Sequence, residues 1–217
     1  MNLEGKKVLF LGDSITEGVG ASSKDTCYVS VFGKISGAEV KNFGISGTRI
    51  AAQKTPSENE RHDKDFMSRV AEMDENADVV VVFGGTNDFG HGDARIGKFD
   101  SRDEYTFYGA MHILCTKLIN KYPDAEIVFM TPLHRLSEDE EVNGIGIRNE
   151  APLSGYVDVI KEVAGFYGLP VLDLFNMSGI QPKVDVIRER YMPDGLHPSD
   201  AGAKKIAERL CAFLKAL

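Results

Sequence analysis

Hydrophobic residues gather along the chain in five short runs, which alternate with segments where apolar residues recur at helical spacing. The runs span residues 6–13, 38–45, 77–85, 125–132 and 169–175. In two of them, at 79–83 and 127–130, every position is apolar, which is typical of strands covered on both faces. The pattern predicts an α/β fold, a three-layer α/β/α sandwich with a five-stranded parallel sheet and right-handed crossovers.

Three segments show the periodicity of amphipathic helices, at residues 101–123, 151–168 and 199–217. The last is the clearest, with Ser199 or Asp200 as N-cap and an apolar stripe of Ile206, Leu210, Phe213 and Leu214. Two irregular stretches, 88–102 and 133–150, are longer than ordinary connections, and such loops usually line a site. We find no internal repeat or linker, so we expect a single domain over residues 1–217.

Composition and charge indicate a globular protein and argue against several classes of binding protein. The chain has 217 residues, of which 42% are hydrophobic and 27% charged, as in ordinary globular proteins. A net charge of -8, with no cluster of basic and aromatic residues, argues against nucleic-acid binding. The three cysteines, Cys27, Cys115 and Cys211, are too far apart for a zinc or redox motif, so we expect buried thiols.

The amino-terminal segment bears on location. Its apolar run is too short for a signal peptide or a membrane span. We therefore expect a cytoplasmic protein without membrane insertion. The oligomeric state stays open, with a homo-oligomer as one alternative.

The ends of the first three runs carry small and polar residues. In an open parallel sheet ligands bind at the carboxyl ends of the strands. The first run ends in Gly-Asp-Ser at Ser14, the second continues to Gly47 in "NFGISG", and the third leads into "GGTND" with Asn87. Ser14 has two interpretations, because a serine after a strand can cap a helix or act as a nucleophile beside a helix N-terminus. Ser46 is a rival nucleophile, but it has no base nearby in the sequence.

A base for Ser14 is available in "MPDGLHPSD", where Asp194 precedes His197 by three residues. A histidine beside a proline in a loop is ordinarily solvated. However, an aspartate that holds Nδ1 while Nε2 faces outward is the arrangement a serine nucleophile needs. The order Ser, Asp, His along the chain also occurs in other α/β hydrolases. The backbone N–H groups of Ser14 and Gly47 and the Asn87 amide are candidate donors to an oxyanion.

These four blocks, "GDS", "NFGISG", "GGTND" and "DGLHP", occur in order between residues 12 and 198 and together resemble the SGNH, or GDSL-type, hydrolase family. The resemblance implies a flavodoxin-like SGNH hydrolase fold. It also implies that Ser14 is the nucleophile, His197 the base and Asp194 its orienting partner, with Gly47 and Asn87 completing the oxyanion hole. Isoleucine follows Ser14 where lipase-named members have leucine, and by resemblance this is common among small esterases and carbohydrate deacetylases.

Four further residues are candidates for substrate contact: Asp13, Arg49, His134 and Arg135. Arg49 follows Gly47 by two residues, so it either anchors the turn or reaches a substrate oxygen. His134 and Arg135 directly follow the fourth run. The histidines show no paired spacing such as H-E-x-x-H, so we expect no metal and no cofactor.

The resemblance and the residues together predict a serine esterase that works through an acyl-enzyme. Because the two long loops are polar, we expect it to remove a short acyl group, such as acetyl, from an acylated sugar or similar polyol. One alternative is a lysophospholipase or acyl-thioester hydrolase, which would need an apolar acyl channel. Another is a non-catalytic carbohydrate-binding protein on the same fold. A nucleotide binder is disfavoured, because the chain lacks both the P-loop and the dinucleotide-binding motif.

Overall fold

The strands form one parallel sheet in a computed structural model that describes all residues from 1 to 217. The five strands are β1 (Lys7–Gly12), β2 (Glu39–Gly44), β3 (Val79–Phe83), β4 (Glu126–Met130) and β5 (Val171–Leu172). Their order across the sheet is β2-β1-β3-β4-β5, and every neighbouring pair is parallel. The predicted five-stranded parallel sheet is therefore confirmed. β5 is shorter than its apolar run, because the Asp173 side chain already accepts a hydrogen bond from the Asn176 N–H and begins the next helix.

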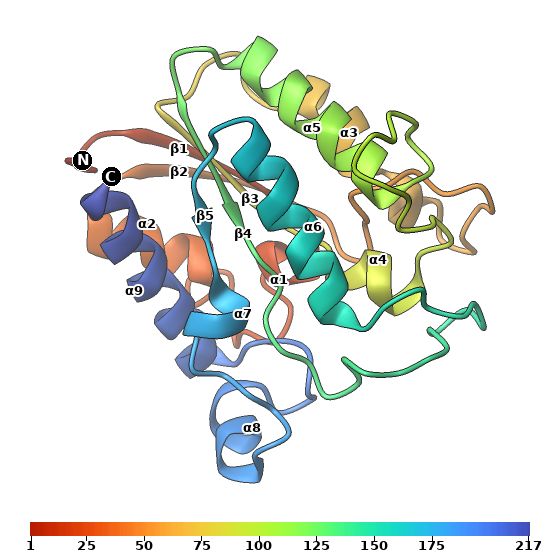
Figure 1. The fold of residues 1–217 in the computed structure, drawn as a ribbon. Coiled ribbons are helices and arrows are strands. Elements are labelled where there is room, and N and C mark those ends of the chain that lie inside the picture. The colour runs from red at the N-terminus through yellow and green to blue at the C-terminus, as the bar shows by residue number, and fades with distance from the viewer.

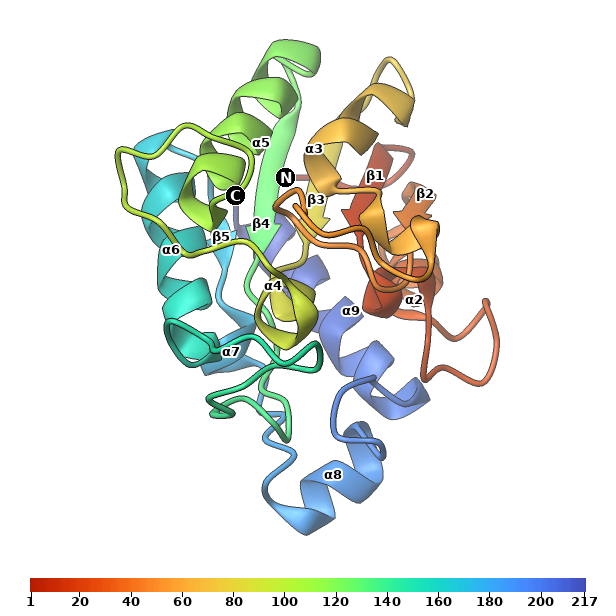
Figure 2. The same cartoon turned by 90° about the vertical axis from the view of Figure 1, so that its right-hand side faces the viewer.

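The strand register brings the first three βα turns to one level of the sheet. Gly12 at the end of β1 lies opposite Gly44 of β2 on one side and Phe83 of β3 on the other. The strand arrows in Figure 2 point toward this edge, where helix α4 (Thr86–His91) and the segment after β2 lie beside each other. The turns that carry the predicted site residues thus meet at one edge.

Helices cover both faces of the sheet (Figure 1). α2 (Tyr28–Ser36) and α9 (Asp200–Ala216) pack on one face, and α3 (Phe66–Arg69), α5 (Phe107–Lys121) and α6 (Leu153–Phe166) pack on the other. Alternate residues of β1 enter the two cores: Val8 and Phe10 contribute to one, Leu9 and Leu11 to the other. The predicted three-layer sandwich is confirmed.

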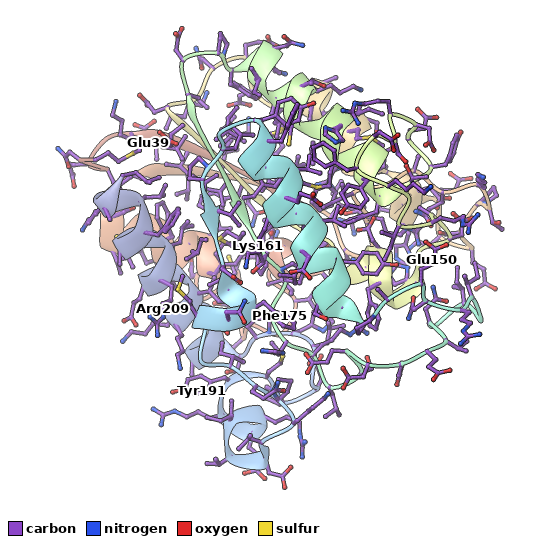
Figure 3. All side chains as sticks on the ribbon, in the orientation of Figure 1. Glu39, Glu150, Lys161, Phe175, Tyr191 and Arg209 are labelled. Atoms are coloured by element: carbon purple, nitrogen blue, oxygen red, sulfur yellow. The ribbon has the colours of Figure 1, made fainter.

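The predicted helices are present with adjusted ends. The segment at 101–123 becomes helical only at Phe107, because the Thr106 side chain caps that helix by accepting from the Gly109 N–H. α9 begins after Ser199, whose side chain accepts from the Gly202 N–H. Its predicted apolar stripe faces the core, with Phe213 partly buried, while Arg209 projects from its outer side (Figure 3).

The helix expected to begin at Ser14 is α1 (Ser14–Glu17). Several further short elements were not predicted: α2, α3, α4, α7 (Leu174–Met177), α8 (Asp185–Tyr191), η1 (Glu60–Asp63) and η2 (Val70–Glu72). Most span one or two turns, too few for a hydrophobic period to stand out. The expectation of an irregular stretch from residue 88 is wrong at its start, because 88–91 belong to α4.

Two further findings concern the cysteines and the helix lengths. All three cysteines are buried free thiols, as predicted. No helix combines the length and the apolar character that crossing a membrane would require.

Candidate active site

Ser14, His197 and Asp194 form a chain of hydrogen-bond contacts at the carboxyl edge of the sheet. The Oγ of Ser14 lies 3.0 Å from Nε2 of His197. On the other side of the ring, Nδ1 of His197 lies 2.7 Å from Oδ2 of Asp194. The structure therefore brings together a hydroxyl, an imidazole and a carboxylate in the order that general-base activation of a serine requires.

The loop before α9 fixes the Asp194 carboxylate. Its Oδ1 accepts hydrogen bonds from the backbone N–H groups of Leu196, at 2.9 Å, and of His197, at 2.7 Å. Partial burial raises the pKa of this carboxyl, but the hydrogen bonds from His197 and Leu196 outweigh it and leave the pKa below its usual value. Asp194 is thus held as an anion that can orient the His197 ring.

Asp13, rather than Ser14, caps the short helix α1. Its Oδ1 accepts a hydrogen bond of 3.0 Å from the Ile15 N–H, and its side chain lies in the interior with 1% of the residue exposed. The Ser14 hydroxyl is therefore free of the capping role and faces His197. As the first residue of α1, Ser14 has a backbone N–H without an intrahelical acceptor.

The burial of Asp13 predicts a pH-dependent stability. Burial raises its pKa from 3.8 to about 7, so between these values the unfolded chain loses the proton while the folded chain keeps it. The free energy of unfolding that the Asp13 carboxyl contributes is therefore greatest below about pH 4, and it is lost as the pH rises toward about 7.

We expect Asp13→Asn, which can still cap α1, to gain in free energy of unfolding relative to wild type as the pH rises. The gain should approach about 4 kcal/mol above neutral pH. Urea unfolding of both proteins between pH 4 and pH 8 checks this, and a difference that stays constant with pH would contradict it.

Gly47 and Asn87 lie next to each other on neighbouring turns. Gly47 has a φ of +75°, outside the helices and strands, and its N–H makes no hydrogen bond within the chain. Asn87 is buried near the start of α4, and its Nδ2 donates to the carbonyl of Thr48 at 3.0 Å. This contact leaves the second amide hydrogen of Asn87 available. Two donors without acceptors thus flank the edge that carries Ser14.

Arg69, which the sequence analysis missed, ties the turns of this edge together. Its buried guanidinium donates to the Thr48 hydroxyl at 2.9 Å, to the Gly12 carbonyl at 3.0 Å and to the Phe43 carbonyl. Burial lowers its pKa to about 10, so it stays a cation at neutral pH. Arg69 therefore links the ends of β1 and β2 to the turn that presents Gly47. No motif marks this arginine in the sequence.

Asp88 makes a second buried link. Its carboxylate accepts the backbone N–H of Ile50 at 3.0 Å and that of Ala51 at 2.9 Å, so it joins α4 to the segment after Gly47. Burial raises its pKa to about 6. Its place directly after Asn87 in "GGTND" is the signal that could have pointed to it.

Arg49 is held by neighbouring side chains. It is 3% exposed, and its guanidinium donates to Nδ1 of His91 at 2.7 Å, to the Ser57 hydroxyl at 2.9 Å and to Oδ1 of Asp63 at 3.1 Å. Of the two interpretations from the sequence, these contacts favour the anchor.

The side chains of the adjacent residues His134 and Arg135 contact different parts of the molecule. The His134 ring packs against Phe175 of α7, which Figure 3 labels, with 3.8 Å between the ring centroids, and its Nδ1 lies 2.6 Å from Oε2 of Glu138. Arg135 instead packs on α4, where its Nη1 donates to the Thr86 carbonyl at 3.1 Å. Arg135 thus supports the helix that carries Asn87. No group of three or more histidine, cysteine or acidic residues is arranged to hold a metal ion.

Comparison with known proteins gives one family and several relatives. The sequence model of the GDSL-like lipase/acylhydrolase family matches residues 10–205. A curated relative, an acetylxylan esterase of Xylanibacter ruminicola, is 27% identical over 96% of this chain, which spans only 43% of that relative's length.

Solved structures share the fold. One is 36% identical, covers 100% of this chain and 99% of its own, and superposes with a TM-score of 0.86. The structure of an acetyl xylan esterase, AlAXEase, is 21% identical, covers 96% of this chain and 99% of its own, and has a TM-score of 0.63.

Proposed function

The chain belongs to the GDSL-like lipase/acylhydrolase family, and from this premise we propose that it is a serine esterase with Ser14, His197 and Asp194 as catalytic residues. The observation that carries the proposal is the contact of 3.0 Å between the Ser14 Oγ and the His197 Nε2, continued by the contact of 2.7 Å to Asp194.

In the proposed mechanism, Nε2 of His197 takes the Ser14 proton as Oγ attacks the ester carbonyl. The backbone N–H groups of Ser14 and Gly47 and the Asn87 amide hold the oxyanion. His197 then gives its proton to the departing alcohol, which leaves an acyl-enzyme on Ser14. A water molecule, activated by His197, attacks this acyl group and releases the acid. Asp194 keeps the ring oriented and stabilises its charged form.

For the substrate, we propose a short acyl group, such as acetyl, on a hydroxyl-rich alcohol. Two observations support it. The groove beside the Gly47 turn is lined mostly by polar residues, and of its twelve lining residues only Ile145 and Ile147 are hydrophobic. The curated relative, in addition, carries the name acetylxylan esterase. The hydroxyl, amide and imidazole groups along this groove suit a hydroxyl-rich alcohol.

The proposal predicts a preference for short acyl chains. We expect kcat/KM for p-nitrophenyl acetate to exceed that for the octanoate by at least about tenfold, as an esterase for short acyl groups requires. Initial rates across the acyl series, measured with a chelator present, check this.

Activity that rises toward octanoate would favour a lysophospholipase or acyl-thioester hydrolase. Absence of turnover by the folded protein for every ester in the series would favour a carbohydrate-binding role and overturn the esterase.

A further inference from the structure

A groove of 680 Å³ opens beside the proposed oxyanion donors. The His62 ring covers Gly47, because a Cβ on this glycine would lie 2.4 Å from the His62 Cδ2. On the other wall, His91 lies one turn after Asn87 on α4, which puts both side chains on the same side of the helix. The two imidazole rings are 6.1 Å apart between centroids. One wall of the groove, at His62, thus lies against Gly47, and the other wall, at His91, lies next to Asn87 on α4.

The size of the groove exceeds what a small acyl group needs and is typical of a site for a small molecule. One side is formed by the segment after β2 and the other by the loop before α6, which is fastened to α4 by a hydrogen bond of 2.8 Å from the Gly144 N–H to the Gly90 carbonyl. Most of its lining side chains carry hydroxyl, amide, imidazole or carboxylate groups. The Glu58 carboxylate has no ion-pair partner in the chain, so it would repel an anion and accept hydroxyl hydrogens.

His91 presents a fixed, uncharged donor to this groove. The Arg49 guanidinium can only donate, so its contact of 2.7 Å with Nδ1 of His91 requires that nitrogen to accept and places the proton on Nε2. Burial first, and then the charge of Arg49, lower the pKa of His91 to about 4, so the ring is neutral at pH 7. Nε2 of His91 makes no hydrogen bond within the chain. It is also not buried, because the only buried side-chain nitrogen or oxygen without a hydrogen-bond partner is Nε of Arg49. Since His91 lines the groove, its Nε2 is accessible from there.

We infer that this groove holds the alcohol part of the substrate and that His91 is a specificity-determining residue, whose Nε2–H donates to an oxygen of a neutral, hydroxyl-rich alcohol. The inference rests on the proposed function. A fixed N–H donor on one wall and the Glu58 acceptor on the other match a polyol, since each hydroxyl both donates and accepts.

The test compares two acetate esters. One is a monoacetylated methyl pentoside, and the other is phenyl acetate, whose leaving group offers no further oxygen. We expect His91→Phe to lower the ratio of kcat/KM for the sugar ester over phenyl acetate by at least about tenfold, the effect of one lost hydrogen bond in a site built for it. His91→Gln, which keeps a side-chain N–H, should recover part of the ratio. His112→Gln, the matched control on a histidine that contacts Tyr167 and Phe99 and does not line the groove, should leave the ratio as in wild type.

The outcomes separate the inference from the proposed function. If wild type hydrolyses neither ester, the proposed function fails. If wild type hydrolyses both and His91→Phe leaves the ratio unchanged, or lowers both rates equally, the assignment of His91 to the alcohol is overturned. A selective gain of His91→Phe on octanoate esters would also overturn it, because the groove would then hold the acyl chain.

Discussion

Ser14→Ala is expected to lower kcat for acetate hydrolysis by about 10⁴ to 10⁶ and to leave the fold intact. The substitution removes the only hydroxyl in contact with His197 Nε2, at 3.0 Å. The helix that Ser14 begins keeps its cap, because Asp13 provides the capping oxygen. Steady-state kinetics on p-nitrophenyl acetate, with thermal unfolding measured in parallel, check both parts.

Ser46→Ala is the matched control for this prediction. Ser46 is the rival serine, and its hydroxyl donates to the Glu17 carboxylate rather than to a base that could activate it. We expect this variant to keep kcat within about tenfold of wild type, below the loss typical of one oxyanion donor. Near-normal turnover by Ser14→Ala, or loss of turnover by Ser46→Ala alone, would assign the nucleophile elsewhere.

His197→Ala should lower kcat by about as much as Ser14→Ala, because neither residue accelerates acyl transfer without the other. For the same reason, the double variant should be no slower than either single variant. Comparing kcat for the four proteins tests this. Two losses that multiply in the double variant would show that the residues act independently. They would then contradict a shared catalytic step.

The sheet could be predicted because each strand is a run of apolar residues that stands out locally. β3 and β4 are covered on both faces, and their continuous hydrophobic sequences reflect that burial. Helices of three or more turns, such as α5, α6 and α9, were visible for the same reason. Most one-turn and two-turn helices were not, because their position is set by tertiary contacts, as with α4 between the Gly47 turn and Arg135.

The candidate site was predictable to the extent that its groups lie in short motifs, three of which follow strands and one of which precedes the last helix. Ser14, Asp194 and His197 come together because the carboxyl end of β1 and the loop before α9 meet at one edge of the molecule. The supports of the site were not predictable. Arg69 lies outside every motif, and its three acceptors come from two strand ends and a turn that only the fold brings together. The pairing of Arg49 with His91 is equally invisible, because 42 residues separate the two along the chain.

The proposal that Ser14 is an activated nucleophile is tested most directly by labelling with a fluorophosphonate, which reacts only with an activated serine. We expect one adduct per chain, located by peptide mass spectrometry at Ser14, and no adduct in Ser14→Ala or His197→Ala. An unlabelled, folded wild-type protein, or an adduct on a different residue, would contradict the esterase mechanism.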